Sequence, residues 1–185
     1  MFKNFMKKYG YYLLAFTLIL VVGVSAGLNN DKTNDKEVIE QTQTSSIQME
    51  SPLKSAEVLK WYSDTELFYN STLKQWESHK GVDLTSSVDN GVYAVLDGTV
   101  KDTCYNYEDG YCVTIEHDNG LISTYCSLSN TDGVKQGDNV TKGQKIGEIS
   151  NTASNESLQG NHLHFSIELN GKKVDPSNYI TFENK

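Results

Sequence analysis

Two short motifs hold the side chains of this chain that are best suited to binding a metal ion. The segment His162-Leu163-His164-Phe165 alternates polar and apolar residues as a β-strand does, so both imidazoles point to one face. In the second motif, His79 and Asp83 lie four residues apart, and Gly81 between them lets the backbone bend. Two imidazoles and one carboxylate bind Zn²⁺ and leave a fourth position for water. Together the motifs predict a site for one zinc ion.

Either motif alone is weak evidence, because a histidine pair on a strand is more often a satisfied surface or core pair than a set of ligands. Their co-occurrence in one chain, followed by Val174-Asp175-Pro176, is much more specific. The alternative to a catalytic ion is a structural ion that only fixes loops. The fourth histidine, His117, ends a predicted strand just before Asp118-Asn119-Gly120, and we interpret it as structural.

The elements that must position these residues are short β-strands. Runs rich in β-branched and aromatic residues occur at Val92 to Leu96, Cys112 to His117, Leu121 to Leu128, Lys145 to Ile149 and His162 to Leu169. Asp118-Asn119-Gly120 and Asn170-Gly171 are strong hairpin signals, because these residues tolerate positive φ. The fold class that follows is mainly β, a compact antiparallel sheet or sandwich. For Ala56 to Trp76, which is rich in aromatic residues, helix and strand both stay open.

The N-terminal region predicts a membrane anchor. An uncharged, mostly apolar run of 18 residues, from Tyr11 to Leu28, follows three lysines, which favours one transmembrane helix with its N-terminus in the cytoplasm. Cleavage after Val24-Ser25-Ala26 as a signal peptide is the alternative. We therefore expect a cytoplasmic N-terminus over residues 1–9, a transmembrane helix over 10–28, a flexible polar stalk over 29–55 and an extracytoplasmic domain over 56–185.

Charge and cysteine usage narrow the function. The net charge is −8, and all sixteen basic residues are lysines, so a nucleic-acid partner is excluded and bidentate arginine clamps are absent. The chain has three cysteines, Cys104, Cys112 and Cys126, and an odd number does not indicate a framework of paired disulfides. Cys104 and Cys112 flank a turn-rich stretch, so they are candidates to pair in an oxidising compartment. The alternative is that all three are small buried apolar residues on strands.

From about Trp76 to Ile180 the chain resembles the LytM, or M23, family of zinc metallopeptidases. The resemblance rests on His79-x-x-x-Asp83, on glycine-rich stretches at Gly91 to Val100 and Gly137 to Gly147, and on Asn161 to Phe165. It implies the LytM-type β fold, zinc bound by His79, Asp83 and His164, and a catalytic role for His162 near the bound water. Active members of the family cut peptide bonds in peptidoglycan.

The sequence departs from this family at one catalytic position. Active members carry a second catalytic histidine in a Tyr-x-His-Leu segment, which reads Tyr125-Cys126-Ser127-Leu128 here. A serine hydroxyl is no useful general base near neutral pH, and general acid–base help is worth roughly 10²–10⁴ in rate. With Ser127 in place of the histidine, we expect zinc binding with little or no hydrolysis.

This departure, the single anchor and the polar stalk resemble the group within the family that acts in endospore formation. That resemblance implies a forespore-membrane protein that binds the ectodomain of a mother-cell protein, stage III sporulation protein AH, as part of a channel between the two cells. The competing hypothesis is an active zinc endopeptidase that cleaves peptidoglycan cross-links. A biotinyl-lipoyl carrier, suggested by Gly137 to Gly147, ranks low because the chain has no modifiable lysine at a suitable hairpin tip.

Overall fold

A computed structural model of the chain describes residues 47–182. The predicted transmembrane helix over residues 10–28 and most of the predicted stalk lie outside this part. Within residues 47–182, no helix has the length and apolar character needed to cross a bilayer.

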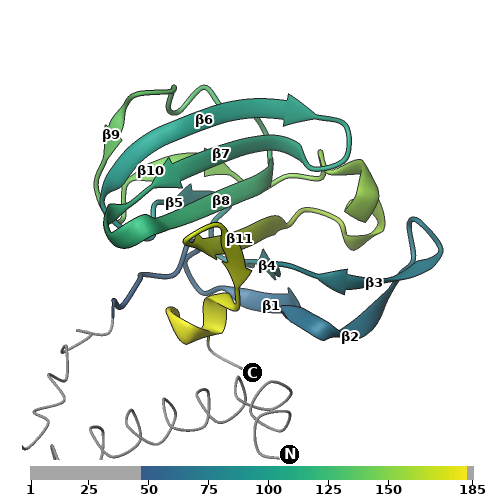
Figure 1. Cartoon of the computed structure of the whole chain (residues 1–185). Coiled ribbons are helices and arrows are strands. Elements are labelled where there is room, and N and C mark those ends of the chain that lie inside the picture. Colours follow the sequence, from purple (N-terminus) through teal and green to yellow (C-terminus); the bar gives the residue numbers. More distant parts are fainter. Residues whose placement is uncertain (1–46, 183–185) are drawn as a thin grey trace, which may run out of the picture. The chain divides into compact units, whose positions relative to one another are not determined.

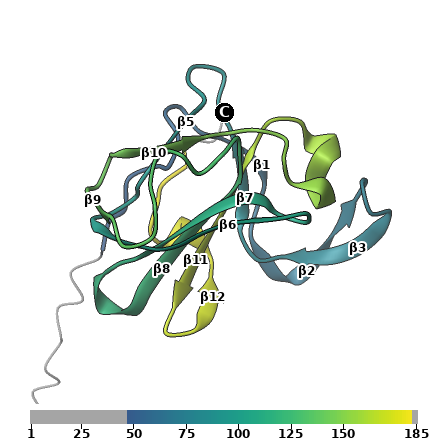
Figure 2. The same ribbon diagram turned by 90° about the horizontal axis from the view of Figure 1, so that it is seen from above.

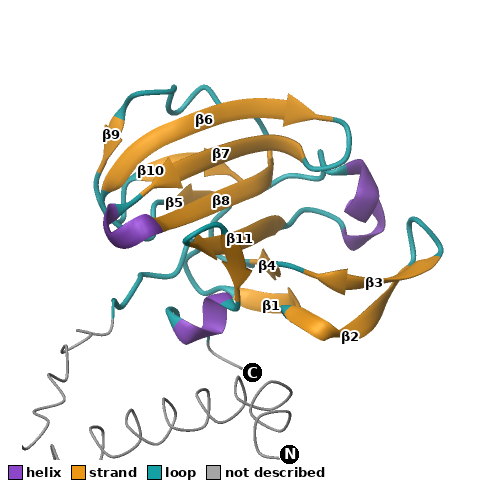
Figure 3. Ribbon diagram, in the orientation of Figure 1, coloured by secondary structure: helices purple, strands orange, loops and turns teal. Residues whose placement is uncertain are grey.

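The described part is built almost entirely of antiparallel strands (Figures 1 and 3). The largest sheet has eight strands, with the order β1-β4-β11-β8-β7-β6-β9 and with β12 paired to β11. Two further sheets have two strands each, β5 with β10 and β2 with β3. The strands are β1 (Glu57–Lys60), β2 (Ser63–Asn70), β3 (Gln75–His79), β4 (Val82–Thr85), β5 (Gly91–Tyr93), β6 (Gly98–Asn106), β7 (Gly110–Glu116), β8 (Leu121–Leu128), β9 (Asn139–Val140), β10 (Lys145–Glu148), β11 (Leu163–Leu169) and β12 (Lys172–Val174). The three 3₁₀ turns are η1 (Asp118–Gly120), η2 (Ser154–Gln159) and η3 (Pro176–Asn178). The predicted mainly β, antiparallel fold class is confirmed.

Turn chemistry explains the two hairpins that frame the central strands. Asn119 and Gly120 have φ of +62° and +73° in the turn that joins β7 to β8. Asn170 and Gly171 have φ of +50° and +81° between β11 and β12. Asparagine and glycine are the residues that adopt such angles at least cost, so both predicted hairpins form where expected.

One face of the large sheet packs into the core. Tyr125 on β8 and Phe165 on β11 are fully buried and lie with ring centroids 5.2 Å apart. Strands β5 and β10 run behind β7 and contribute Val92 and Ile146 to the same core (Figures 1 and 2). Alternation along each strand therefore leaves the opposite face of β11 and β8 free for polar chemistry.

The folded part begins earlier in the chain than the sequence suggests. Met49 and Leu53 are 4% and 2% exposed, and the Glu50 N–H donates to the Val95 carbonyl at 3.1 Å. The prediction that the stalk extends to residue 55 is therefore wrong for residues 47–55, which belong to the folded domain. The apolar side chains of this segment, Ile47, Met49, Pro52 and Leu53, are few and stand among polar neighbours, so its composition resembles that of the stalk.

The cysteines pair differently from both arrangements that the sequence leaves open. Cys112 on β7 is bonded to Cys126 on β8, with their Cα atoms 4.2 Å apart, and Cys104 is an exposed free thiol. Cys104 and Cys112 do face each other across the β6–β7 pair. Cys112 thus has a cysteine on either neighbouring strand, and the β7–β8 register, which the sequence does not reveal, brings Cys126 to it.

A chain of buried polar groups ties β8 to the loop that follows β5. The Tyr125 hydroxyl accepts the Val95 N–H at 3.0 Å and lies 3.0 Å from Ser123 Oγ. Ser123 Oγ in turn lies 2.7 Å from Nε2 of His117, whose Nδ1–H donates to the Asp97 carbonyl at 2.8 Å. His117 is structural, as predicted.

Removal of the Tyr125 hydroxyl should destabilise the domain. In Tyr125→Phe the Val95 N–H and Ser123 lose a buried partner, and we expect the free energy of unfolding to fall by about 1–3 kcal/mol. Urea unfolding measures the change. Tyr105→Phe is the matched control, because Tyr105 is 56% exposed, and should change stability by less than about 0.5 kcal/mol. Equal losses in both variants would contradict the role of the network.

His117 should make stability depend on pH. Burial lowers the pKa of His117, and the hydrogen bond to the Asp97 carbonyl offsets this only in part. The folded state then binds fewer protons than the unfolded state, whose histidine pKa is about 6.5. The stability from neutral His117 is present above that value and is lost as pH falls through the folded pKa. Between pH 7 and pH 5, unfolding free energies should decline more steeply for wild type than for His117→Gln. Parallel profiles would contradict this assignment.

Candidate metal centre

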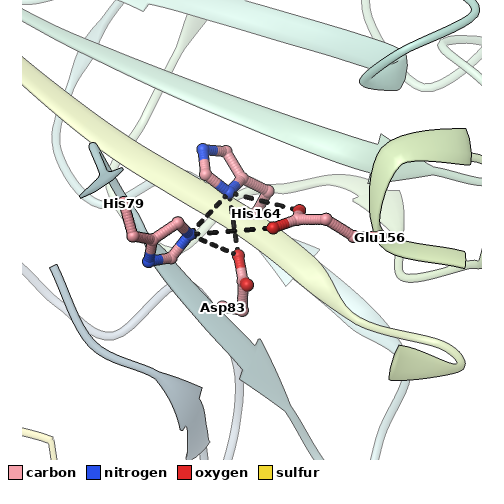
Figure 4. Close-up of side chains that lie close together, drawn as sticks. All are labelled: His79, Asp83, Glu156 and His164. Carbon is pink, nitrogen blue, oxygen red and sulfur yellow. Dashed lines mark hydrogen bonds and ion pairs between the residues drawn. The ribbon is translucent and has the colours of Figure 1, made fainter. Parts of the chain in front are cut away.

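Four side chains from three parts of the chain converge on one point of the large sheet (Figure 4). His79 ends β3, Asp83 lies on β4, His164 lies on β11 and Glu156 lies in η2, and one ligand atom from each falls within 4.8 Å of all the others. The sheet register explains the first convergence, because His164 is directly opposite Asp83 and opposite residues point to one face. The structure thus brings together the three predicted ligands, His79, Asp83 and His164, and adds Glu156.

The spacing of the donor atoms fits one tetrahedral ion. Asp83 Oδ1 lies 2.8 Å from His164 Nδ1 and 3.1 Å from His79 Nε2, and the two nitrogens are 3.3 Å apart. Glu156 carboxylate oxygens lie 3.6 Å from His164 Nδ1 and 3.9 Å from His79 Nε2. Ligands at about 2.0–2.2 Å from a tetrahedral zinc ion are separated by about 3.3 Å. The four groups are therefore close enough to share one metal ion once these distances adjust by about half an ångström.

Neighbouring groups fix the orientation of these side chains. The Nδ1–H of His79 donates to the Trp61 carbonyl at 2.9 Å, which leaves Nε2 free to face the centre. Gln159 Nε2 donates to the second oxygen of Asp83 at 2.9 Å. Lys60 Nζ lies 3.0 Å from Glu156 and 3.8 Å from Asp83, so one cation already offsets part of the two carboxylate charges.

Gly81 has a different role from the one predicted. A Cβ atom at this position would approach the Phe165 carbonyl to 2.7 Å and His164 Nε2 to 2.8 Å. Both distances are shorter than Cβ contacts normally reach, so any side chain would displace the backbone or the imidazole. Glycine is required here for the close approach of the β3–β4 segment to β11, and its φ is not positive.

The pKa values show how strongly the groups interact. Burial would raise the pKa of Asp83, but hydrogen bonds from His164 and His79 outweigh it and hold the pKa far below its usual range. For His164, burial lowers the pKa, but the bond to Asp83 and the charges of Asp83 and Glu156 raise it overall. The site thus stabilises positive charge at the imidazole nitrogens, where protons and a metal ion compete.

The two predicted catalytic residues lie in different environments. His162 is fully buried, its Nδ1 lies 2.9 Å from the Gly160 carbonyl oxygen, and its Nε2 lies 3.4 Å from Glu156. It therefore borders the centre. Ser127 is an extra residue in a β-bulge between β7 and β8, with φ of +62°, and its hydroxyl donates to the Ser150 carbonyl at 2.9 Å. Within residues 47–182, no hydrogen bond joins Ser127 to the four converging residues.

Glu156 is the functional residue that the sequence does not reveal. It lies in a polar stretch, Asn155-Glu156-Ser157, without strand or helix periodicity. Its position depends on tertiary contacts, because Ser154 N and Asn155 N donate to the carbonyls of Tyr107 and Glu108 in the β6–β7 turn at 3.2 and 3.3 Å. A carboxylate eight residues before His164 is not a recognisable ligand spacing.

Metal binding should depend on Asp83 and Glu156. Zn²⁺ at about a hundred times its Kd should stabilise the wild type by about 2.7 kcal/mol, measured as a rise in Tm. Asp83→Asn should abolish this rise, and Glu156→Gln should weaken binding about tenfold or more in calorimetry, since a neutral amide is a poor ligand. Glu148→Gln is the matched control, because Glu148 is exposed and paired with Lys145. Equal zinc affinity in Glu156→Gln and Glu148→Gln would contradict ligation by Glu156.

Comparisons with known proteins agree with this geometry. Residues 77–176 match the model of peptidase family M23. The chain is 38% identical over 114 residues to stage II sporulation protein Q of Bacillus subtilis, and 33% identical over 102 residues to the peptidoglycan DD-endopeptidase ShyA of Vibrio cholerae. These matches cover 60% and 55% of this chain but only 38% and 23% of the two relatives, so the chain spans less than half of their length.

Solved structures show the same fold. The structure of the SpoIIQ–SpoIIIAH pore-forming complex matches with a TM-score of 0.62 and 30% identity, over 73% of this chain and 92% of that one. A second SpoIIIAH–SpoIIQ complex matches with a TM-score of 0.60 and 32% identity, over 71% and 99% of the two chains. A zinc-containing peptidase from Vibrio cholerae matches at 0.55 and 26%, over 64% and 35%. With the family model covering more than half of its length, the chain belongs to peptidase family M23.

Proposed function

We propose that this chain is a zinc-binding, catalytically silent M23 domain that acts as the forespore half of a scaffold in endospore formation, with a mother-cell partner similar to stage III sporulation protein AH. The likeness to stage II sporulation protein Q and to its two complexes supports this role. The proposal rests mainly on the position of Glu156, whose carboxylate lies within 4.8 Å of the ligand atoms of the three expected metal-binding residues.

Glu156 bears on catalysis because hydrolysis needs an open coordination position. Catalytic zinc sites have three protein ligands and a water, whereas structural sites have four protein ligands. Here a fourth donor is supplied by the chain itself and is held by Lys60 and by His162, at 3.0 and 3.4 Å. Bound zinc would supply a positive charge held by residues of β3, β4, β11 and η2, and Glu156 as a fourth protein ligand would leave no position for a water.

Ser127 supports the same conclusion independently. Its hydroxyl is committed to the Ser150 carbonyl, and its side chain is fully buried. It can neither accept a proton near pH 7 nor stabilise a developing oxyanion as a cation. A domain that lacks both the open position and one imidazole is suited to binding rather than to hydrolysis.

The proposed location is the space between the two membranes, with the chain anchored by residues 10–28 and its N-terminus in the cytoplasm of the forespore. The disulfide between Cys112 and Cys126 supports an oxidising compartment outside the cytoplasm. The polar residues that follow the anchor would span the distance from the membrane to the domain. In this arrangement the domain reaches its partner across the gap and contributes to the channel between the cells.

An edge of the large sheet is the proposed docking surface for the partner. Strand β6 pairs with β7 along its length, but β9 pairs only with its first two residues, Gly98 and Thr99. Within residues 47–182, the outer side of residues 101–106 has no strand beside it. An exposed edge of this kind binds an extended segment of another protein by β-strand addition.

Strand addition predicts a local change in hydrogen exchange. When the full chain binds the ectodomain of a partner similar to stage III sporulation protein AH, the amides of residues 101–106 that point away from β7 should exchange at least about tenfold more slowly, because these N–H groups gain acceptors. The β2–β3 ribbon is the internal control and should be unchanged. Protection confined to β2 and β3 would place the partner elsewhere.

An active endopeptidase is the second candidate. It is favoured by His162, which borders the centre, and by a pocket of about 400 Å³ next to Glu156, lined by Lys60, Phe68, Asn70 and Gln159 among others. In this alternative, Glu156 would have to leave the centre when substrate binds.

Digestion of purified peptidoglycan separates the two candidates. The wild-type chain with Zn²⁺ should leave the muropeptide profile unchanged and equal to that of Asp83→Asn. A metal-dependent release of peptides by wild type, absent in Asp83→Asn, would establish hydrolysis and contradict the proposal that the domain is catalytically inactive. Ser127→His combined with Glu156→Ala tests the cause, because the double variant should gain activity that neither single variant shows.

A further inference from the structure

The three cysteines lie in one row across the large sheet, and the row ends at the metal centre. Cys104 on β6 is directly opposite Cys112 on β7, and Cys112 is bonded to Cys126 on β8. Cys126 is directly opposite His164 on β11, which is opposite Asp83 on β4. Directly opposite residues point to the same face of an antiparallel sheet. The row therefore runs from an exposed thiol to the side chains that converge on the centre.

The other face of the same strands confirms this alternation. Tyr105 and Tyr111, the neighbours of Cys104 and Cys112, contact each other with ring centroids 4.7 Å apart. Tyr125, the neighbour of Cys126, packs on Phe165 in the core. All three sulfur atoms thus lie on the face opposite to the core, where η2 lies.

The row has the arrangement that thiol–disulfide exchange requires. The attacking thiolate, the attacked sulfur and the leaving sulfur are arranged in a line in this reaction. Here Cys104 is free and exposed, whereas Cys112 and Cys126 are bonded and only 4% and 5% exposed. Neighbouring strands are spaced about 4.7–4.9 Å apart, so Cys112 lies between two cysteines at similar distances.

We propose that Cys104, Cys112 and Cys126 form a thiol–disulfide exchange site in which the disulfide moves between Cys112–Cys126 and Cys104–Cys112. The Cys104 thiolate attacks Sγ of Cys112, a Cys104–Cys112 bond forms and the Cys112–Cys126 bond breaks. Cys126 leaves as a thiolate and takes up the proton that Cys104 gave to water. One thiol and one disulfide are present before and after, so no oxidant or reductant is consumed.

The exchange moves the free thiol from one end of the row to the other. In the first isomer the thiol is exposed on β6, at the open edge of the sheet. In the second isomer it belongs to Cys126, opposite His164. A soft ligand is thereby placed beside a candidate ligand of the metal centre. This inference does not depend on the proposed function, because it concerns only sulfur atoms and the sheet register.

The environment of Cys104 sets the pH dependence of the exchange. Burial raises the pKa of the Cys104 thiol, and the carboxylates of Asp102 and Asp109 raise it further. Since the thiolate is the attacking species, the exchange rate should increase about tenfold per pH unit below that pKa.

Three single variants test the geometry, because each leaves one pair of cysteines. In a glutathione redox buffer with chelator, Cys104→Ser should form Cys112–Cys126, and Cys126→Ser should form Cys104–Cys112. Cys112→Ser is the matched control, because Cys104 and Cys126 are then separated by a whole strand, about 9–10 Å, and should stay reduced. Circular dichroism and Tm establish that each variant is folded. Free thiols in folded Cys126→Ser would overturn the proposal.

The wild-type chain tests the exchange itself. The full-length protein is incubated with chelator and without glutathione at pH 7 and pH 8, quenched with acid, labelled with maleimide and mapped by peptide mass spectrometry. We expect label on Cys126 together with a Cys104–Cys112 disulfide, appearing about tenfold faster at pH 8 and at a rate independent of protein concentration. Label on Cys104 alone at every time and pH would overturn the proposal.

Discussion

The rest of the site depends on one buried carboxylate, Asp83. It is fully buried, and its Oδ1 meets an imidazole nitrogen from β3 and another from β11, while Gln159 binds its other oxygen. A buried charge that lost these partners would cost several kcal/mol. Asp83 therefore fixes the β4–β11 register, the end of β3 and the position of η2 together. The metal-binding geometry follows from satisfying this one group.

The fold could be predicted from the sequence where local chemistry determines it. Strand β8 begins and ends where predicted, at Leu121 and Leu128, because hydrophobic alternation and the Asn119-Gly120 turn agree. Strand β6 is not among the runs that the sequence predicts, because most of its nine residues are polar and exposed, as is common on edge strands. Strands β2 and β3 carry the exposed aromatic residues Tyr69 and Trp76, so the sequence pattern there does not distinguish a helix from a strand.

The candidate site was predictable to the extent that its residues lie on strands with strong patterns. His79, Asp83 and His164 were found because residue type and spacing pointed to one chemistry. Glu156 and the Cys112–Cys126 pairing were not, because both depend on register and on a loop held by contacts from β6 and β7. These contacts place a fourth carboxylate donor beside the three predicted ligands, which residue type and spacing along the chain do not reveal.

The attachment of η2 to the β6–β7 turn links two surfaces of the domain thermodynamically. The amide groups of Ser154 and Asn155, the two residues that precede Glu156, donate hydrogen bonds to that turn. The same β6–β7 hairpin carries the open sheet edge. If a ligand at the edge changes the affinity of the centre for an ion, the bound ion must change the affinity of the edge for that ligand by the same factor. The two binding equilibria must therefore report the same coupling constant, whichever ligand is titrated first.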